Sequence, residues 1–93
     1  MALTFEWDPE KAEHNIAKHG IEFNEAATVF GDSLSLTIPD PDHSFGEQRY
    51  VTIGIEYSGR LLVVVHTDTK ERIRIISARR ASRAERNGYE KGT

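Results

Sequence analysis

The alternation of apolar and polar residues is clearest in the second half of the chain, where it predicts three strands. Residues 48–57 (QRYVTIGIEY) carry an apolar side chain at every second position, which is typical of a strand. Residues 61–67 (LLVVVHT) begin with five apolar residues and predict a central strand that is buried on both faces. Residues 72–77 (RIRIIS) alternate arginine with isoleucine. Because only short turns separate these segments, we expect an antiparallel meander.

The first half of the chain predicts two helices. Residues 8–20 (DPEKAEHNIAKHG) begin with an aspartate suited to the N-cap and a proline suited to the first helical position. Gly20 suits the left-handed residue that ends a helix, and Ala12, Ile16 and His19 would form the buried stripe. Residues 23–31 (FNEAATVFG) predict a second, shorter helix that ends at a glycine.

Extended segments precede and follow this helix pair. Residues 3–7 predict a short extended piece. Residues 33–39 (SLSLTIP) place Leu34, Leu36 and Ile38 on one side, which predicts a strand with one buried face. Residues 39–47 contain two prolines and a glycine among polar residues and predict a loop.

The end of the chain carries a capping box, in which Ser82 stands three residues before Glu85. A helix should therefore run from about Arg83 to about Lys91, weakened at Gly88 by roughly 1 kcal/mol relative to alanine. The expected fold class is α+β, in one domain over residues 1–93. It consists of an N-terminal helix pair, an antiparallel sheet of about four strands and a short C-terminal helix.

Composition narrows the class of protein. The 93 residues include no cysteine, which excludes disulfides and thiolate metal sites. No apolar run approaches the roughly 20 residues of a membrane helix. The N-terminus has acidic residues where a signal peptide needs a basic start. These features predict a cytoplasmic protein that has no contact with a membrane.

The formal net charge of −3 hides an asymmetry between the two halves of the chain. Residues 1–47 hold ten acidic and two basic side chains, whereas residues 48–93 hold five acidic and ten basic ones. Either the basic half binds a polyanion, or the two halves neutralise each other across the fold.

Residues 72–86 (RIRIISARRASRAER) concentrate the positive charge. Six of these fifteen residues are arginine: Arg72, Arg74, Arg79, Arg80, Arg83 and Arg86. A guanidinium group binds phosphate through two hydrogen bonds and stays charged at neutral pH, which suits a nucleic-acid backbone or a phosphodiester being cleaved. We expect the arginines of the strand, of its end and of the helix to converge on one edge of the sheet. The alternative is that several of them pair with the acidic half.

The arginines differ in what they indicate. A doublet at a strand end, Arg79 with Arg80, costs self-repulsion unless an anion is bound, which favours a functional role. Arg83 and Arg86 fit exposed, solvated helix charges better. Arg49 continues an apolar strand face, so it lies either at the edge of that face or in a cleft.

Two other side chains are candidates for proton transfer or base contact. Tyr89 follows Arg86 by about one turn and either meets a nucleotide or packs onto the sheet. His66 ends the central strand and serves either as a general acid or base or as a hydrogen-bonded structural residue. His43 with Asp40 and Asp42 is only a weak metal motif, because aspartates in a proline-rich loop are usually turn formers. We expect no metal and no cofactor.

Three segments, FEWDPEKAEHNIAKHGIEF, RYVTIG and IRIISARRASRAERNGY, together resemble the BrnT family of bacterial type II toxins. The resemblance implies a RelE-like fold, a small sheet flanked by helices. It implies a ribonuclease that cuts RNA and arrests translation. It also implies a partner, a BrnA-like antitoxin with a ribbon-helix-helix domain. Two copies of each would form a complex that represses its own promoter, so that operator DNA is bound through the antitoxin.

The resemblance also implies a metal-independent mechanism that leaves a 2′,3′-cyclic phosphate. Phosphate and transition-state ligands would be Arg49, Arg74, Arg79 and Arg80, and Tyr89 or His66 would move protons. Further RNA contacts would come from Lys18, Arg72, Arg83 and Arg86. The resemblance supports Arg49, Arg74, Arg79 and Tyr89 more than Arg80 or His66. The alternative is a non-catalytic module that binds the antitoxin through a basic patch and acts as a co-repressor.

Overall fold

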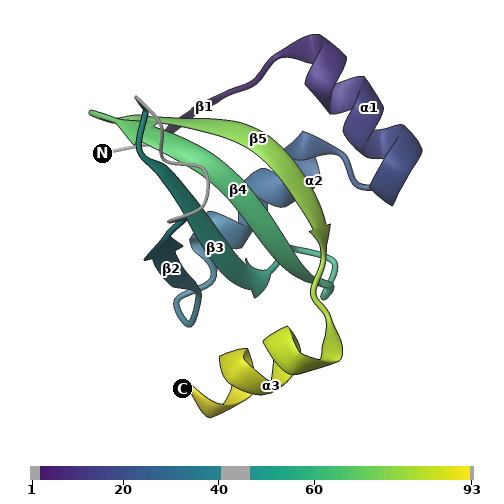
Figure 1. Ribbon diagram of the computed structural model, residues 1–93, viewed down its shortest axis with the longest axis vertical. Helices are drawn as coiled ribbons and strands as arrows, with labels where there is room; N and C mark the ends of the chain where they lie inside the picture. Colours follow the sequence, from purple (N-terminus) through teal and green to yellow (C-terminus); the bar gives the residue numbers. More distant parts are fainter. Residues whose placement is uncertain (1–2, 41–46, 93) are drawn as a thin grey trace.

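The computed structural model describes residues 3–40 and 47–92 and contains one five-stranded sheet (Figure 1). Its strands are β1 (Thr4–Glu6), β2 (Leu36–Pro39), β3 (Arg49–Ile55), β4 (Leu61–Thr69) and β5 (Arg72–Arg80), in the spatial order β1-β5-β4-β3-β2. The meander of β3, β4 and β5 is antiparallel, as predicted. The loop predicted at residues 39–47 falls largely outside the described residues, as do Asp42 and His43 of the weak metal motif.

The prediction of about four antiparallel strands is wrong, because β1 adds a fifth strand that runs parallel to β5. Thr4, Phe5 and Glu6 pair with Arg72, Ile73 and Arg74. Three residues are too few for an alternating pattern to appear, so the segment showed only as an extended piece. Its pairing covers the first part of the outer edge of β5.

Helix α1 (Pro9–His19) has the predicted ends. The Asp8 side chain accepts a hydrogen bond from the backbone N–H of Glu10 at 2.8 Å, and Gly20 is left-handed with φ 70°. The predicted stripe is wrong at Ile16, which is 46% exposed, whereas Ala12 packs against the core and Asn15 is buried. A polar side chain therefore anchors this helix.

Asn15 completes the outer edge of β5 where β1 has ended. Its amide donates to the carbonyl oxygens of Ala78 and Ile21, both at 2.9 Å, and the Ala78 N–H donates back at 3.0 Å. Buried backbone groups need such partners, because leaving them unpaired costs free energy. One side chain thus fastens α1 to β5 and to the segment that leads into the next helix.

The predicted second helix is divided. It begins as α2 (Phe23–Ala27) and continues as a 3₁₀ turn, η1 (Thr28–Gly31), so the N-terminal helix pair is one eleven-residue helix and one short composite. The Thr28 hydroxyl donates to the carbonyl of Glu25 at 2.7 Å and accepts from the backbone N–H of Tyr57 at 2.9 Å. These bonds accompany the tighter turn and tie it to the end of β3.

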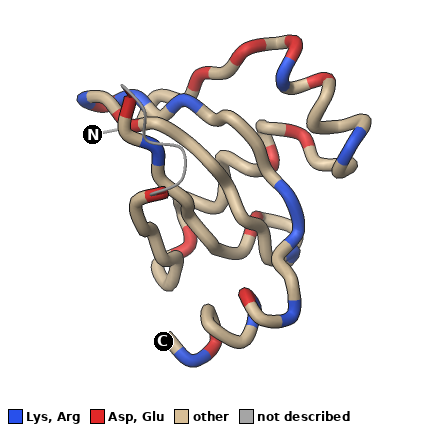
Figure 2. Tube along the Cα trace, viewed as in Figure 1, with Lys and Arg blue, Asp and Glu red and all other residues tan. Residues whose placement is uncertain are grey.

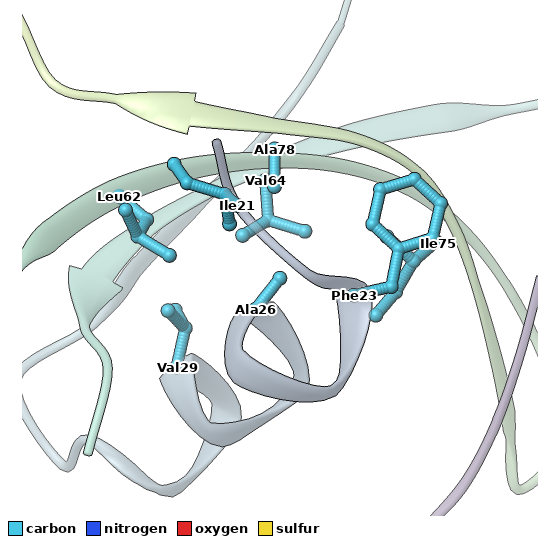
Figure 3. Close-up of a cluster of buried hydrophobic side chains, with 8 residues drawn as sticks. All are labelled: Ile21, Phe23, Ala26, Val29, Leu62, Val64, Ile75 and Ala78. Carbon is cyan, nitrogen blue, oxygen red and sulfur yellow. The ribbon is translucent and has the colours of Figure 1, made fainter. Parts of the chain in front are cut away.

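The hydrophobic core lies between α2 with η1 and one face of the sheet (Figure 3). It contains Ile21, Phe23, Ala26 and Val29 from the helical side and Leu62, Val64, Ile75 and Ala78 from the sheet. Gly54 allows the close approach of η1 to β3, because a Cβ there would lie 2.8 Å from the Val29 side chain. We call this side of the sheet the core face.

On the opposite side, the open face, none of the described helices crosses the centre of the sheet (Figure 1). Val51, Ile53, Val63 and Val65 lie on it in paired positions, and Leu36 and Ile38 of β2 extend it. The prediction that residues 33–39 bury their apolar side is therefore wrong: Leu34 is 52% exposed and Ile38 is 60% exposed. The central strand β4 is buried over most of its length, as predicted.

Helix α3 (Arg83–Lys91) agrees with its prediction, including the reciprocal capping box of Ser82 and Glu85. It follows β5 and lies beyond the end of the sheet where that strand finishes (Figure 1). Among the described residues, no helix is long and apolar enough to cross a membrane.

Candidate functional site

The arginines of β5 do not converge at one edge of the sheet. Arg72 and Arg74 lie near the start of the strand, and Arg79 and Arg80 are its last two residues. The partners of Arg74 and Arg79 on β4 are Thr67 and Val63, four residues apart. At about 3.3 Å per residue, that separation is roughly 13 Å along the sheet.

A β-bulge nevertheless places Arg74 and Arg79 on the same face. Residues five apart in a regular strand point to opposite sides. Here Val65 pairs with Ser77 and His66 pairs with Ile75, so Ile76 is an extra residue in β5. Arg74, Ser77 and Arg79 therefore all belong to the open face, and an extra residue of this kind re-aims side chains in many functional sites.

Arg49 joins this set across the sheet. It pairs with Thr67, which in turn pairs with Arg74, so that these three residues form a row across β3, β4 and β5 on the open face. Arg49 is half-buried and Arg74 is exposed. Within residues 3–40 and 47–92, Arg74 forms an ion pair with Glu47 at 3.8 Å, which is a loose and solvent-exposed pair. The row is therefore open to an external anion. Positive charge also gathers at the two ends of β5 in Figure 2.

Arg79 is held by a carboxylate from α3. Its two terminal nitrogens donate to the two oxygens of Glu85, both at 2.8 Å, and Glu85 also accepts from the backbone N–H of Ser82. The Arg79 guanidinium holds the pKa of Glu85 down to about 2, and the pair raises the pKa of Arg79. This arginine therefore positions α3 as well as bordering the open face.

Arg80 lies on the other side of β5 from Arg79. It pairs with Leu62, a core residue, and borders a polar pocket of about 250 Å³ with Arg60 and Arg86 at the end of the sheet. Arg83 is exposed on α3, and Arg86 pairs loosely with Glu90 at 3.9 Å. Arg72 contacts Glu6 of β1 at 3.3 Å. Arg80, Arg83 and Arg86 lie around the end of the sheet. Arg72 pairs with Thr69 on the open face, but it lies outside the row of Arg49 and Arg74.

Tyr89 packs rather than facing solvent. It is 7% exposed, and its hydroxyl donates to Oδ2 of Asp32 at 2.6 Å. This hydrogen bond to a carboxylate, together with burial, raises the pKa of Tyr89 to about 12. Of the two alternatives for Tyr89, the geometry favours packing onto the sheet.

His66 lies within a chain of hydrogen bonds on the core face. Its Nε2 is 2.7 Å from the hydroxyl of Thr52, and its Nδ1 is 2.6 Å from Asp68. The ring is 1% exposed and meets Phe30 edge-on. Burial lowers the pKa of His66, although Asp68 opposes that shift. Both ring nitrogens are occupied, so the structural alternative fits this histidine better.

Two grooves border the open face. The first, of about 290 Å³, lies between α3 and the apolar positions of β2, β3 and β4, with Ile53, Val63 and Tyr89 in its lining. The second, of about 270 Å³, lies between α1 and β5. Its lining consists of Lys11, His14, Asn15, Lys18, His19, Ile76 and Ser77. Lys18, a predicted RNA contact, thus lies beside the bulge.

Two polar clusters were not found by sequence reasoning. Asn15 was missed because a lone asparagine in a helix gives no periodic signal. Glu56 is buried at the β3–β4 turn, where backbone N–H groups and Arg60 donate to it and hold its pKa at about 2 against the opposing effect of burial. Arg60 also contacts Glu25 of α2 at 2.8 Å. Within the described residues, no three His, Asp or Glu side chains form a group that could hold a metal ion.

The fold and this face define a small α+β domain in which α2 and η1 cover one face of the sheet and arginines border the apolar centre of the other. A family model described as "Ribonuclease toxin, BrnT, of type II toxin-antitoxin system" matches residues 7–85. The crystal structure of the Brucella abortus ribonuclease toxin BrnT matches with a TM-score of 0.69 and 25% sequence identity, covering 88% of this chain and 100% of that one. A comparison with curated proteins finds no match. This chain belongs to the BrnT family of ribonuclease toxins of type II toxin–antitoxin systems.

Proposed function

We propose that this chain is a metal-independent endoribonuclease that binds the RNA backbone on its open face. Arg49 and Arg74 are the phosphate ligands at the scissile bond, and Arg79 is a third, more distant ligand. The observation that supports this assignment is the bulge at Ile76, which brings Arg74 and Arg79 to the face that Arg49 also occupies.

The proposed reaction is an internal transfer. The ribose 2′-oxygen bonds to phosphorus, the bond from phosphorus to the 5′-oxygen breaks, and a 2′,3′-cyclic phosphate remains. The guanidinium groups of Arg49 and Arg74 stabilise the extra negative charge that develops on the phosphoryl oxygens. Arginine is not a general base at neutral pH, so the 2′-hydroxyl proton passes to water and water protonates the 5′-oxygen.

Tyr89 and His66 support the site from a distance in this proposal. Tyr89 holds α3 on the sheet through Asp32, and His66 orders the strands through Thr52 and Asp68. The other predicted RNA contacts, Arg72, Arg80, Arg83 and Arg86, lie outside the row. They are assigned no contact with the scissile phosphate.

Cleavage of RNA by the free toxin would arrest translation, and an antitoxin would neutralise it. Membership of a type II toxin family supports an antitoxin partner. The resemblance of the sequence supports a BrnA-like partner with a ribbon-helix-helix domain, two copies of each chain in the complex, and operator binding through that domain. The first groove, apolar and adjacent to α3, suits a helix or strand of that partner.

The test is cleavage of a defined RNA oligonucleotide by the purified chain in EDTA, with analysis of the product ends. The proposal predicts 2′,3′-cyclic phosphate ends and loss of cleavage in the Arg49→Gln/Arg74→Gln variant. The Lys70→Gln/Lys91→Gln variant removes the same charge elsewhere and should cleave normally. Cleavage by the arginine variant at the wild-type rate would exclude the assignment.

A second candidate function is a non-catalytic module that binds the antitoxin. Two observations favour it: Arg79 is already paired with Glu85, and neither Tyr89 nor His66 is free to transfer a proton. Expression of the chain without an antitoxin separates the two candidates. Growth arrest supports the ribonuclease, whereas normal growth with tight antitoxin binding supports the module.

A further inference from the structure

The side of helix α1 that faces β5 carries lysine and histidine side chains. The second groove is lined on the helix by Lys11, His14, Lys18 and His19, around the buried Asn15. An α-helix rotates by about 100° per residue, so these positions all lie on one side of it. Glu13 lies about 200° around the helix from Lys11, on the opposite side. Neither Glu10 nor Glu13 lines the groove. The side of α1 that borders the groove is therefore basic.

The lysines of this groove have no carboxylate partner in the part of the chain that the structure describes. Within residues 3–40 and 47–92, no ion pair involves Lys11 or Lys18, whereas Arg72, Arg74 and Arg79 each have one. Both lysines are exposed. Among the residues that the structure describes, no carboxylate balances their positive charges, which leaves them available to an anion.

The groove is connected to the open face by the bulge. Its floor is formed by Ile76 and Ser77, and Ser77 belongs to the open face between Arg74 and Arg79. Helix α1 runs along β5, because Pro9 borders the same pocket as Arg74 and Asn15 bonds to Ala78. Lys11 and Lys18 are about 10 Å apart along the helix axis. They therefore lie beside β5 in the same direction as Arg74 and Arg79.

We propose that this groove is a second RNA-backbone subsite, in which Lys11 and Lys18 bind the phosphates next to the nucleotide held by Arg49 and Arg74. The inference rests on the proposed ribonuclease function and extends it from one phosphate to a path of several. The lining favours a nucleic-acid backbone over a peptide, because its side chains are mostly cationic or polar and Ile76 is the apolar exception. A peptide helix would find apolar contacts in the groove beside α3 instead.

Binding of an RNA oligonucleotide with 2′-O-methyl groups tests the subsite without cleavage, because the nucleophile is blocked. Fluorescence anisotropy at several salt concentrations gives the slope of log K against log salt. On a single strand, each phosphate that the protein no longer neutralises lowers the magnitude of that slope by about 0.7. The Lys11→Gln/Lys18→Gln variant should bind more weakly, with a slope smaller by about 1.4. Lys70→Gln/Lys91→Gln is the charge-matched control and should keep the wild-type slope.

Cleavage of unmodified RNA gives a second readout. Because the lysines contact the substrate away from the bond that breaks, their removal should raise KM and leave kcat unchanged. Equal melting temperatures of the two double variants would show that both remain folded.

The outcomes separate the subsite from the function on which it rests. Wild-type affinity and slope in the Lys11→Gln/Lys18→Gln variant would overturn the subsite, even if the wild type cleaves RNA. Loss of affinity for the antitoxin alone, with RNA binding intact, would also overturn it and would assign the groove to the protein partner. If the wild-type chain neither binds nor cleaves RNA, the proposed function fails, and the subsite fails with it.

Discussion

The two faces of the sheet use the same strands for different purposes. The core face is covered by α2 and η1, and its side chains are buried in one cluster. Apolar side chains also alternate regularly along β3 and β2 on the open face. Leu36 and Ile38 nevertheless remain exposed, and arginines border this face at both ends. The difference shows that alternation identifies a strand but not which side of it is buried. What covers a face is decided by helices elsewhere in the chain.

Arg79 and Arg80 are neighbours in β5 that lie on opposite faces of the sheet. Substituting each in turn therefore tests whether RNA uses only the open face. Arg79→Gln should reduce kcat/KM for RNA cleavage by about tenfold, because it removes one charge-assisted contact to a phosphate away from the bond that breaks. Arg80→Gln should reduce it by less than about threefold. Single-turnover cleavage at neutral pH measures both.

Arg79 also anchors Glu85, so its variant needs a structural control. Glu85→Gln breaks the same ion pair and leaves the arginine in place. The Glu85→Gln variant should retain RNA cleavage, and it should lose as little unfolding free energy as Arg79→Gln does. Equal losses of cleavage in the Arg79 and Glu85 variants would assign Arg79 to positioning α3 alone.

On the covered side, Asn15→Ala should cost about 3 kcal/mol of unfolding free energy. Three buried backbone groups lose their partner, and each unpaired group costs about 1 kcal/mol or more. Urea denaturation measures the change. Ile16→Ala, on the exposed side of the same helix, is the matched control and should cost less than about 1 kcal/mol.

Acid should weaken the turn that joins β3 to β4. The pKa of Glu56 is about 2 in the folded chain, because Ser58 and Arg60 hydrogen-bond its carboxylate, and is near 4.5 in the unfolded chain, where these hydrogen bonds are absent. A lowered pKa stabilises the fold above about pH 4.5, and the stabilisation disappears as the pH falls toward 2. The advantage of the wild type over Glu56→Gln should therefore shrink between these values by about 2 kcal/mol. Urea denaturation at pH 6 and pH 3 checks this, and a constant difference would contradict it.

The smallest effect is expected from Tyr89→Phe. Removal of the hydroxyl breaks its hydrogen bond to Asp32 and should cost about 1.5 kcal/mol of stability. Cleavage should change by less than about threefold. A general acid or base normally contributes at least about 10²-fold, so a loss of that size in a folded variant would restore Tyr89 as a proton-transfer residue.

Much of the fold could be predicted because its signals are local. The N-cap at Asp8, the left-handed Gly20 and the capping box of Ser82 with Glu85 each depend on residues within one turn, and all three were confirmed. The pairing of β1 with β5 joins residues nearly 70 positions apart and leaves no local pattern. The division of the second helix at Thr28 depends on contacts with the end of β3 in the same way.

The candidate site was less predictable for a related reason. The arginines were found from their density, but strand periodicity would place Arg74 and Arg79 on opposite faces. Only the pairing of β4 with β5 reveals the extra residue Ile76. Of the basic groove only Lys18 was predicted, because its lysines and histidines lie on α1, far in sequence from the arginines they accompany.

The proposed function and the second subsite both require that RNA binds the open face. The most direct test is an NMR titration of the ¹⁵N-labelled chain with the 2′-O-methyl RNA oligonucleotide. RNA binding to the open face should give the largest amide shifts at Arg49, Thr67, Arg74 and Ser77, with little change in α2 and η1. Shifts confined to the helices of the covered side, or to the end of the sheet at Arg80 and Arg86, would contradict it.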